Sequence, residues 1–497
     1  MTCLVYWLVL RLAQDGWVAG VAALVFALHP VQAEAVSDIT SVQEPLSTFF
    51  LLAGVLVWLG RREPGRERIR LACASACYAG ALLSKESGLM FLPLLAVLEG
   101  ALPAAGGSVQ TIRQRVRDFL AAVIPFLGIT LLYIALRIWA LKGFAHTVTP
   151  VALPTEMLTI PSVLLFYLRL LVWPADLACY YDTPYILAPS RGGFVLPGVV
   201  VLGVIAALGF WYARTRRHAP REARLIAFGT LWMSVAIVPV LNFRLLPEGE
   251  IAHDRYLYLP LVGVALLVGL GLRQASGLGV RFQRRPIWGL AGVVLLALLL
   301  GFAALRQSLY WSDDLTLNYR AHLVAPRNIY ATTSFAAAAA QSGREEAAIA
   351  LYQQALAARP DFWRANVNLA YLYYAHGNFA EASRYFQRAC AADPTDGDQF
   401  LYLGMSLLRM GQTGEAEKAI HTALLVRPNG VNYHLGLAMV LMQESRLEEA
   451  RQELEKELAE DPHNAQAEAL LGQVTQQLEN SPQKLTSGPS AASPVHH

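Results

Sequence analysis

The sequence predicts an all-α protein, in which a polytopic membrane domain of helices is followed by a solenoid of paired helices. Residues 1–305 consist of apolar runs separated by short basic patches, whereas the sequence from Ser312 onward is Ala-rich and has the pattern of soluble helices. In this second part proline recurs at a fixed interval of 34 residues. The averages over all 497 residues, 55% hydrophobic and 15% charged, conceal this division into two parts.

The apolar runs predict about ten membrane spans. The first is partial, because it is too short to cross roughly 30 Å of hydrocarbon as a helix. The predicted spans are 2–12, 17–28, 46–60, 71–83, 88–102, 119–141, 195–213, 225–241, 256–272 and 287–305. Residues 160–173 contain Arg169 and have Pro161 and Pro174 at their ends, which favours an interfacial or re-entrant helix that does not cross.

Basic residues gather in alternate loops, which predicts the orientation in the membrane. Clusters at 61–70, 113–117, 214–224 and 273–285 are rich in arginine, and we expect them on the cytoplasmic side. The connections 29–45, 84–87, 142–194 and 242–255 then face the periplasm or a lumen. The last span delivers the soluble part to this outer side. The sequence therefore predicts a multi-pass protein of a bacterial inner membrane or an ER-like membrane.

Charge and cysteine content exclude several classes of function. The net charge of +3 is small and the positive charge is concentrated in the membrane part, so nothing indicates nucleic-acid binding. The five cysteines show neither a metal-ligand spacing nor a disulfide framework. His29 precedes Pro30 with no second histidine at ligand spacing, which favours a helix-end histidine over a metal ligand. We therefore predict no protein metal site from the spacing of residues.

The proline interval identifies the soluble part. Pro326, Pro360, Pro394, Pro428 and Pro462 follow the 34-residue period of tetratricopeptide (TPR) repeats, in which two helices form each unit. We expect a linker at 306–328, four TPR repeats at 329–462, a capping helix at 463–478 and a disordered tail at 479–497. Such an array presents a concave groove that suits a protein or peptide partner.

The outer loops carry the candidate site residues. A carboxylate at the edge of a bilayer is costly unless a cation offsets it, so such residues are functional candidates. Lys and Arg neutralise phosphate, a carboxylate can act as a general base or hold a divalent metal, and tyrosine packs against a sugar. This chemistry suits a lipid-linked phosphosugar. The candidates are the carboxylates Glu34, Asp38 and Glu44, the cations Lys85 and Arg255, and the substrate-contacting residues Tyr181, Asp182 and Tyr256.

Each of these residues also has a structural interpretation. The three carboxylates could lie in water beyond the headgroups. Lys85 and Glu86 could form an interfacial ion pair of little energetic value. Arg255 and Tyr256 could anchor the chain at the membrane interface.

Four motifs in this order, together with the repeats, resemble the TMTC family of transmembrane, TPR-containing protein O-mannosyltransferases and their bacterial homologues. The resemblance covers residues 1 to about 478. The motifs are His29-Pro30-x-x-x-Glu34-Ala35-Val36, Leu82-Leu83-Ser84-Lys85-Glu86, Tyr167-Leu168-Arg169-Leu170-Leu171-x-x-Pro174 with Tyr181-Asp182 downstream, and Asp254-Arg255-Tyr256-Leu257-Tyr258-Leu259-Pro260.

The resemblance implies the GT-C class of glycosyltransferase. Such an enzyme transfers a sugar, mannose in the animal members, from a polyprenyl-phosphate carrier to a protein Ser or Thr hydroxyl. Lys85 and Arg255 would then face the phosphate, and Glu34, with Asp38 or Glu44, would line the acceptor or metal side.

The chain departs from the family pattern in two places. It starts within what resembles the second helix, so the loop that holds the leading catalytic acid is missing and the sequence is expected to be N-terminally truncated. Val42 and Glu44 stand where relatives carry Arg and Asp. The alternative function is therefore an inactive, membrane-anchored TPR scaffold. A flippase or ligase of lipid-linked sugars is a weaker alternative, because His146, Arg169 and Arg191 show no convincing Arg–His arrangement.

Overall fold

The computed structural model describes residues 1–60, 65, 67–102, 111–141, 150–276, 281–282 and 285–480. Its contacts divide the chain into two units, Met1–Ala331 and Thr332–His497. The predicted all-α class is confirmed, since the described strands are only β1 (Arg281–Phe282) and β2 (Arg285–Pro286), an antiparallel pair. The residues of the basic clusters at 61–64, 66 and 283–284, the candidate His146 and the tail from 481 onward lie outside the described residues.

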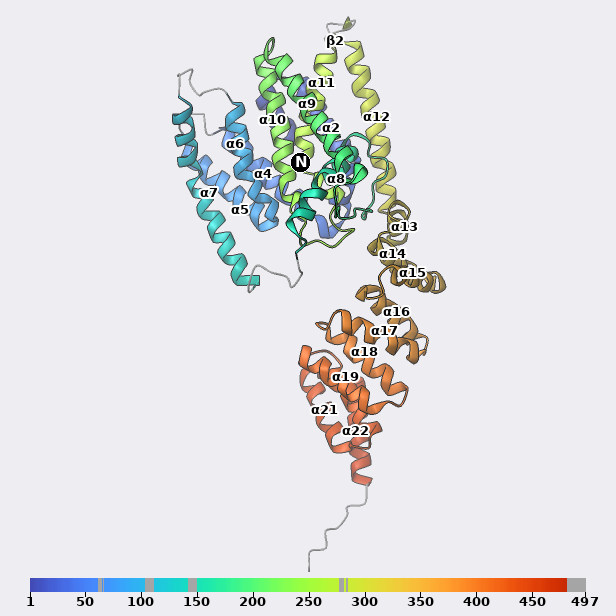
Figure 1. Cartoon of the computed structure of the whole chain (residues 1–497). Helices are drawn as coiled ribbons and strands as arrows, with labels where there is room; N and C mark the ends of the chain where they lie inside the picture. The colour runs from blue at the N-terminus through green and yellow to red at the C-terminus, as the bar shows by residue number, and fades with distance from the viewer. Residues whose placement is uncertain are drawn as a thin grey trace, which may run out of the picture. The chain divides into compact units, whose positions relative to one another are not determined.

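The first unit is a bundle of helices around a single hydrophobic core (Figure 1). Its α-helices are α1 (Thr2–Ala13), α2 (Gly16–Leu28), α3 (Ala33–Ser37), α4 (Gln43–Gly60), α5 (Glu67–Ser84), α6 (Phe91–Ala101), α7 (Ile112–Leu141), α8 (Leu153–Val172), α9 (Leu196–Arg216), α10 (Pro220–Ile237), α11 (Pro260–Ser276), α12 (Ile287–Tyr310) and α13 (Asp314–Val324). Its short helices are η1 (Pro30–Gln32), η2 (Ile39–Ser41), η3 (Glu86–Met90), η5 (Arg191–Val195), η6 (Val238–Leu241) and η7 (Asp254–Leu257).

Every predicted span coincides with a helix, but the helices differ in length. By length and composition, six helices of the described chain could cross a membrane, or seven if α2 and the bent segment after it form one span. Helices α1 and α6, with 12 and 11 residues, are shorter than the roughly 20 residues that a full crossing needs. The helix expected at 160–173 is the longer α8, whose 20 residues also meet the criteria for a span.

A bend after α2 directs the segment that follows it back into the bundle. Asp15 caps the start of α2 by accepting hydrogen bonds from the backbone N–H groups of Trp17 and Val18, at 2.9 and 3.3 Å. Pro30 has no backbone N–H to donate and forces the preceding residue into an extended conformation, so α2 ends at Leu28. The chain turns by 52° and continues through η1 and α3. This bend brings Glu34 to a buried position.

Two glycines allow α10 and α11 to pack with their backbones in contact. A Cβ atom added to Gly263 would lie 2.5 Å from the carbonyl oxygen of Gly229. Small residues at such crossings let membrane helices approach closely. The contact positions the connection between these two helices, because η7 lies immediately before α11.

We expect Gly263→Ala to lower the free energy of unfolding by about 1–3 kcal/mol, the usual cost of overpacking. The new methyl group would push against backbone atoms, which cannot rotate away as a side chain can. The melting temperature and denaturant midpoint of the purified protein measure this loss. Gly203→Ala in α9 is the matched control, since nothing lies within 4 Å of its added Cβ atom, and it should not destabilise the protein. An unchanged Gly263→Ala variant would contradict the close crossing.

The second unit contains the predicted repeats as helix pairs. The chain runs through α14 (Ile329–Gln341), α15 (Glu345–Ala358), α16 (Trp363–Ala375), α17 (Phe379–Ala392), α18 (Gly397–Arg409), α19 (Thr413–Val426), α20 (Tyr433–Gln443), α21 (Leu447–Glu460) and α22 (Ala465–Asn480). From α15 to α22 each helix packs against the next in sequence. Helix α22 covers the last pair, at the place where a capping helix is expected.

The turn inside each pair requires a left-handed residue at the same repeat position. Gly343, Gly377 and Gly411 have φ angles of +74°, +74° and +77°, and the fourth repeat has Ser445 there with φ +62°. A residue with a Cβ atom pays about 1–2 kcal/mol in this conformation, whereas glycine does not. The period of 34 residues thus appears in the backbone as well as in the prolines.

We expect Ser445→Gly to raise the free energy of unfolding of the repeat array by about 1 kcal/mol, because it removes this strain. The reverse change, Gly411→Ser, should lower it by a similar amount. Denaturant unfolding followed by far-UV circular dichroism measures both shifts. Two changes of the same sign would contradict the argument.

Candidate functional site

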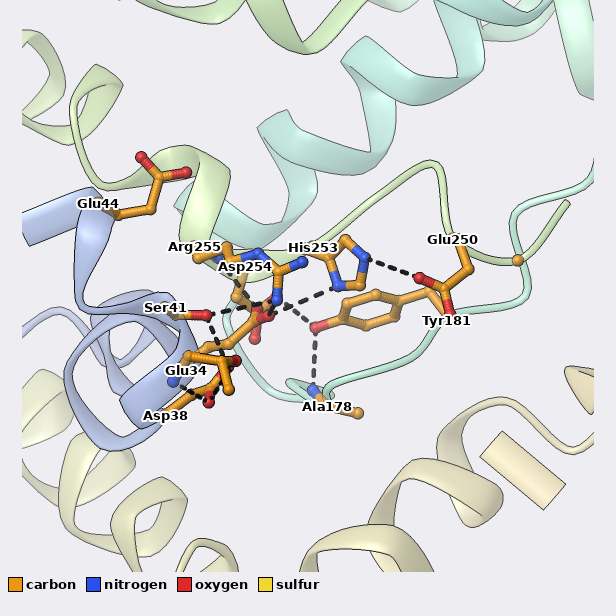
Figure 2. Close-up of polar contacts among 12 residues, drawn as sticks. Glu34, Asp38, Ser41, Glu44, Ala178, Tyr181, Glu250, His253, Asp254 and Arg255 are labelled. Atoms are coloured by element: carbon orange, nitrogen blue, oxygen red, sulfur yellow. Dashed lines mark hydrogen bonds and ion pairs between the residues drawn. The ribbon is translucent and has the colours of Figure 1, made fainter. Parts of the chain in front are cut away.

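The centre of the candidate site is a buried ion pair between Glu34 and Arg255. Glu34 comes from α3 and is 1% exposed, and Arg255 comes from η7. The Nη1 atom of Arg255 donates to Oε1 of Glu34 at 2.7 Å, and the backbone N–H of Arg255 donates to Oε2 at 3.0 Å (Figure 2). Both carboxylate oxygens of Glu34 are therefore held by the same residue, which fixes α3 against η7.

His253 lies beside this pair and carries positive charge. Its Nδ1 atom is 3.5 Å from Oε1 of Glu34 and its Nε2 atom is 3.7 Å from Oε2 of Glu250. Burial by itself lowers the pKa of His253, but the two carboxylates outweigh burial and raise this pKa to about 9. At neutral pH the imidazole is therefore protonated, and it adds a second cation next to Glu34.

Asp254 and Tyr181 form a hydrogen-bonded pair next to the ion pair of Glu34 and Arg255. The hydroxyl of Tyr181 donates to a carboxylate oxygen of Asp254 and accepts from the backbone N–H of Ala178 at 2.9 Å (Figure 2). Burial, and then the charge of Glu34, raise the pKa of Asp254 well above its usual value. Tyr181 is thus connected to the predicted site through its hydrogen bond to Asp254. Its hydroxyl already has two hydrogen-bond partners, Asp254 and Ala178.

Asp38 reaches the cluster through Ser41. The hydroxyl of Ser41 donates to Asp38 at 2.6 Å and lies 3.4 Å from Nη1 of Arg255. Burial raises the pKa of Asp38, but hydrogen bonds from Ser41 and Thr40 together lower it below its usual value. A carboxylate stabilised in this way is ionised and weakly basic.

A second ion pair joins Lys85 to Glu44. Glu44 lies in the first turn of α4, and its side chain is 8% exposed, against 17% for that of Lys85. The ring of Tyr256 is close to both cations of the site, with Nζ of Lys85 at 5.3 Å and Cζ of Arg255 at 5.5 Å from its centroid. The pair of Lys85 with Glu86 considered above is wrong, since Glu86 pairs with Arg137.

Asp182 belongs to a different, polar cavity. This cavity has a volume of about 470 Å³ and is lined in part by Arg169, Asp176, Tyr181, Asp182 and Arg320. Asp176 lies 3.0 Å from Arg169 and 3.4 Å from Arg320, measured between carboxylate oxygens and guanidinium nitrogens. The cavity shares Tyr181 with the buried cluster, so the two lie on either side of this residue.

An apolar groove of about 230 Å³ adjoins the charged cluster. Helices α8, α9 and α10 provide most of its lining, and Leu257 of η7 completes it. Tyr167 lines the groove, and its hydroxyl also accepts a hydrogen bond from the backbone N–H of His253 at 3.4 Å. An elongated apolar group in this groove would end beside the charged residues.

No group of three or more His, Cys, Asp or Glu side chains in the described part of the chain is arranged to hold a metal ion. The divalent metal considered from the sequence therefore stays a prediction. His29 does not contact the buried cluster through its ring, since its Nε2 atom lies 3.1 Å from the carbonyl oxygen of Leu171.

The sequence interpretation did not assign roles to Ser41, Glu250, His253 or Asp254. His253 and Asp254 stand directly before Arg255, so the sequence shows that they are close to this arginine. No spacing rule connects them to Glu34, which lies more than 200 residues earlier. Of the predicted residues, Glu34, Asp38, Glu44, Lys85, Arg255 and Tyr256 lie together, Tyr181 is joined to them through Asp254, and Asp182 lies outside their contacts.

The raised pKa of His253 predicts how stability depends on pH. A group whose pKa rises from 6.5 to about 9 on folding stabilises the protein fully below pH 6.5, and this contribution disappears as the pH rises through 9. We expect wild type to exceed His253→Gln by about 3 kcal/mol below pH 6.5, and the difference to shrink toward pH 10. Melting temperatures between pH 6 and 10 measure it. The exposed His218→Gln is the control, and a pH-independent difference for His253→Gln would contradict the assignment.

Fold and site together define a helical membrane-type protein with a charged site in the segments that connect its helices and a TPR array after the last apolar helix. Two TPR family models, both described as tetratricopeptide repeats, match residues 339–404 and 401–465 and confirm the repeats. Among solved structures, that of YrrB, described as a TPR protein with an unusual peptide-binding site, is 24% identical with a TM-score of 0.31. The match covers 33% of this chain and 85% of the YrrB chain.

The curated relatives are protein O-mannosyl-transferases. TMTC3 of Mus musculus is 24% identical over 391 residues, which cover 73% of this chain and 41% of the relative. TMTC3 of Homo sapiens is 24% identical over 411 residues, covering 78% of this chain and 44% of the relative. Tmtc3 of Drosophila melanogaster is 25% identical over 418 residues, covering 76% of this chain and 44% of the relative. The chain thus spans less than half the length of these relatives.

The resemblance to the TMTC family is confirmed by these homologues. Their membrane character agrees with the several apolar helices of the first unit, which are consistent with a membrane location for this chain.

Proposed function

We propose that the membrane unit transfers a sugar, mannose as in the names of its relatives, from a polyprenyl-phosphate carrier to a Ser or Thr hydroxyl of a protein. One observation carries this proposal. Lys85 and Arg255 both lie over the ring of Tyr256, and each of these cations is paired with a buried carboxylate. Buried charges of both signs in the outer loops of a membrane protein are costly, which favours a functional role.

The polyprenyl chain and the phosphate of the donor lipid match two different parts of the site. The polyprenyl chain matches the apolar groove between α8, α9 and α10, which Tyr167 connects to the charged cluster. The phosphate matches the cations, Arg255 as a planar fork of donors and Lys85 as a point charge. Tyr256, close to both cations, offers the sugar an apolar face and a hydroxyl.

Binding of the phosphate would change the partners of the carboxylates. The phosphate competes with Glu44 for Lys85 and with Glu34 for Arg255. Glu34 keeps the backbone N–H of Arg255 and the protonated His253, whereas Lys85 is the side-chain partner of Glu44 among the described residues. A buried carboxylate that loses its cation binds a proton more readily. Glu44 is therefore the general base of the proposed reaction.

In this reaction Glu44 takes the proton of the acceptor hydroxyl, and the hydroxyl oxygen attacks the anomeric carbon of the sugar. The bond from that carbon to the phosphate oxygen breaks, and its electrons leave with the polyprenyl phosphate. Lys85 and Arg255 neutralise the charge that develops on the phosphate. Attack opposite the leaving group inverts the anomeric configuration.

The TPR array would serve the acceptor. Its helix pairs form a surface of the type that binds an extended peptide, and we propose that it recruits the acceptor protein or a partner. This requires the array and the charged loops to lie on the same side, the periplasmic or lumenal one. Asp182 and Tyr181, which line the polar cavity, are proposed to contact the acceptor or the sugar.

A transfer assay with the full chain in proteoliposomes tests this function. Labelled polyprenyl-phosphate mannose is expected to label Ser or Thr of an acceptor protein, with inverted linkage. Lys85→Met should raise the donor KM at least tenfold, because it removes a phosphate ligand. Arg137→Met is the control, since Arg137 forms a similar but exposed pair with Glu86.

The same assay separates the enzyme from the scaffold alternative. A scaffold would give no transfer and no specific binding of the donor lipid, and Lys85→Met and Arg137→Met would then behave alike. Either result would overturn the proposal.

A further inference from the structure

A third cavity lies at the opposite end of α10 from the charged outer loops. It has a volume of about 390 Å³ and is lined by Arg11, Leu12, Gln14, Ala101, Leu102, Arg221, Arg224 and Leu225. Arg221 lies in the first turn of α10, roughly 24 Å along the helix axis from the end that leads to the site. This cavity is therefore distinct from the proposed donor site.

The lining of this cavity is positively charged. It contains three arginines and no acidic residue. The nearest acids in sequence are Asp15, Glu99 and Glu222. Asp15 and Glu222 both pair with Arg273, at 2.8 Å each, and Glu99 accepts a hydrogen bond from Nε1 of Trp58 at 2.9 Å. Within the described ranges no acid lies at ion-pair distance from Arg221 or Arg224. Two of the three guanidinium groups at the cavity are thus available to an external anion.

The ends of three helices meet around the cavity. Arg11 stands in the last turn of α1, Leu102 follows α6, and Arg221 opens α10. No side chain caps the first turn of α10, so backbone N–H groups there add to the positive potential. Leu12, Leu102 and Leu225 supply apolar walls. Positive charge combined with apolar walls at the end of a helical bundle suits an amphipathic molecule with an anionic group and an apolar part.

We propose that this cavity binds the phosphate-bearing headgroup of an anionic membrane phospholipid. The arginines neutralise the phosphate, and the leucines contact the glycerol and upper acyl region. The cavity lies among the basic clusters expected on the cytoplasmic side, where anionic lipids attract such residues. A lipid bound there connects α1, α6 and α10 and stabilises the bundle at the end away from the proposed reaction. This inference stands independently of the sugar-transfer function.

Lipid titration of the detergent-purified full chain tests the proposal. Phosphatidylglycerol should raise the melting temperature of the wild type by several degrees and remain bound in native mass spectrometry, whereas phosphatidylcholine should do neither. Arg221→Gln/Arg224→Gln should lower the affinity for phosphatidylglycerol at least tenfold. Arg216→Gln/Arg217→Gln is the matched control, since both residues are exposed on the same connection but do not line the cavity, and it should bind as the wild type does.

Two results would overturn the proposal. One is equal loss of phosphatidylglycerol binding in both double variants, which would reflect unspecific attraction to basic loops. The other is an equal melting shift with glycerol phosphate or inorganic phosphate at the same concentration, which would assign the cavity to a soluble anion. The single variant Arg224→Gln keeps the test valid if the double variant does not fold, and it should lose part of the affinity.

Discussion

Replacing Arg255 by alanine is expected to lower the free energy of unfolding of the membrane unit by about 3–5 kcal/mol, because Glu34 then keeps a buried charge without its guanidinium partner. Glu34 is 1% exposed, so water cannot replace the hydrogen bond that the guanidinium group donates to its carboxylate, and His253, 3.5 Å away, is the remaining cation beside it. The backbone N–H of residue 255 remains, but the charge of the side chain is lost. Denaturant unfolding of the purified protein, followed by tryptophan fluorescence, measures the difference.

Two further variants separate loss of the ion pair from loss of packing. Glu34→Gln/Arg255→Ala removes both charges, and we expect it to recover most of the stability lost in Arg255→Ala. Arg169→Ala is the matched control, since Arg169 and Asp176 are about half exposed and such a pair contributes about 0–1 kcal/mol. If Arg255→Ala and Arg169→Ala have equal effects, Glu34 does not depend on Arg255 as the structure indicates.

The repeat array is the part that the sequence predicted most completely. Each repeat is a local unit, so the prolines and glycines that end its helices recur at the same interval as the structure itself. Gly343, Gly377 and Gly411 mark three left-handed turns in the sequence, but Ser445 does not reveal the fourth. Ser445 adopts the same left-handed conformation as these glycines, in the turn between α20 and α21, which pack against each other.

The contacts of the candidate site could be predicted only in part. From the positions of the basic loops, the sequence predicted that the acids and the cations lie on one side of the membrane unit, and the structure pairs Glu44 with Lys85 and Glu34 with Arg255. The pairing of each acid with a cation depends on the bend after α2 and on the crossing of α10 and α11. Pro30 and the two glycines mark these places in the sequence, but they do not indicate which acid meets which cation. Lys85 illustrates this, since its partner is Glu44 and not its neighbour Glu86.

Replacing Glu44 by glutamine is expected to reduce kcat for sugar transfer by about 10²–10⁴-fold, the range that a general base contributes. Glutamine keeps the shape of the side chain but cannot take the proton of the acceptor hydroxyl. The KM for the donor should stay equal or fall, because Lys85 no longer has Glu44 as a competitor for the phosphate. Initial rates with varied polyprenyl-phosphate mannose, at saturating acceptor, separate these two parameters.

Glu86→Gln is the matched control for this variant, because Glu86 follows Lys85 directly but its carboxylate pairs with Arg137 at the surface. It should retain the kcat of the wild type. A Glu44→Gln variant with normal kcat, next to a Glu34→Gln variant without activity, would assign the base to Glu34 instead. A parallel rise of KM in Glu44→Gln would show that Glu44 holds Lys85 in place for the phosphate, since the exchange of partners proposed above requires the opposite change.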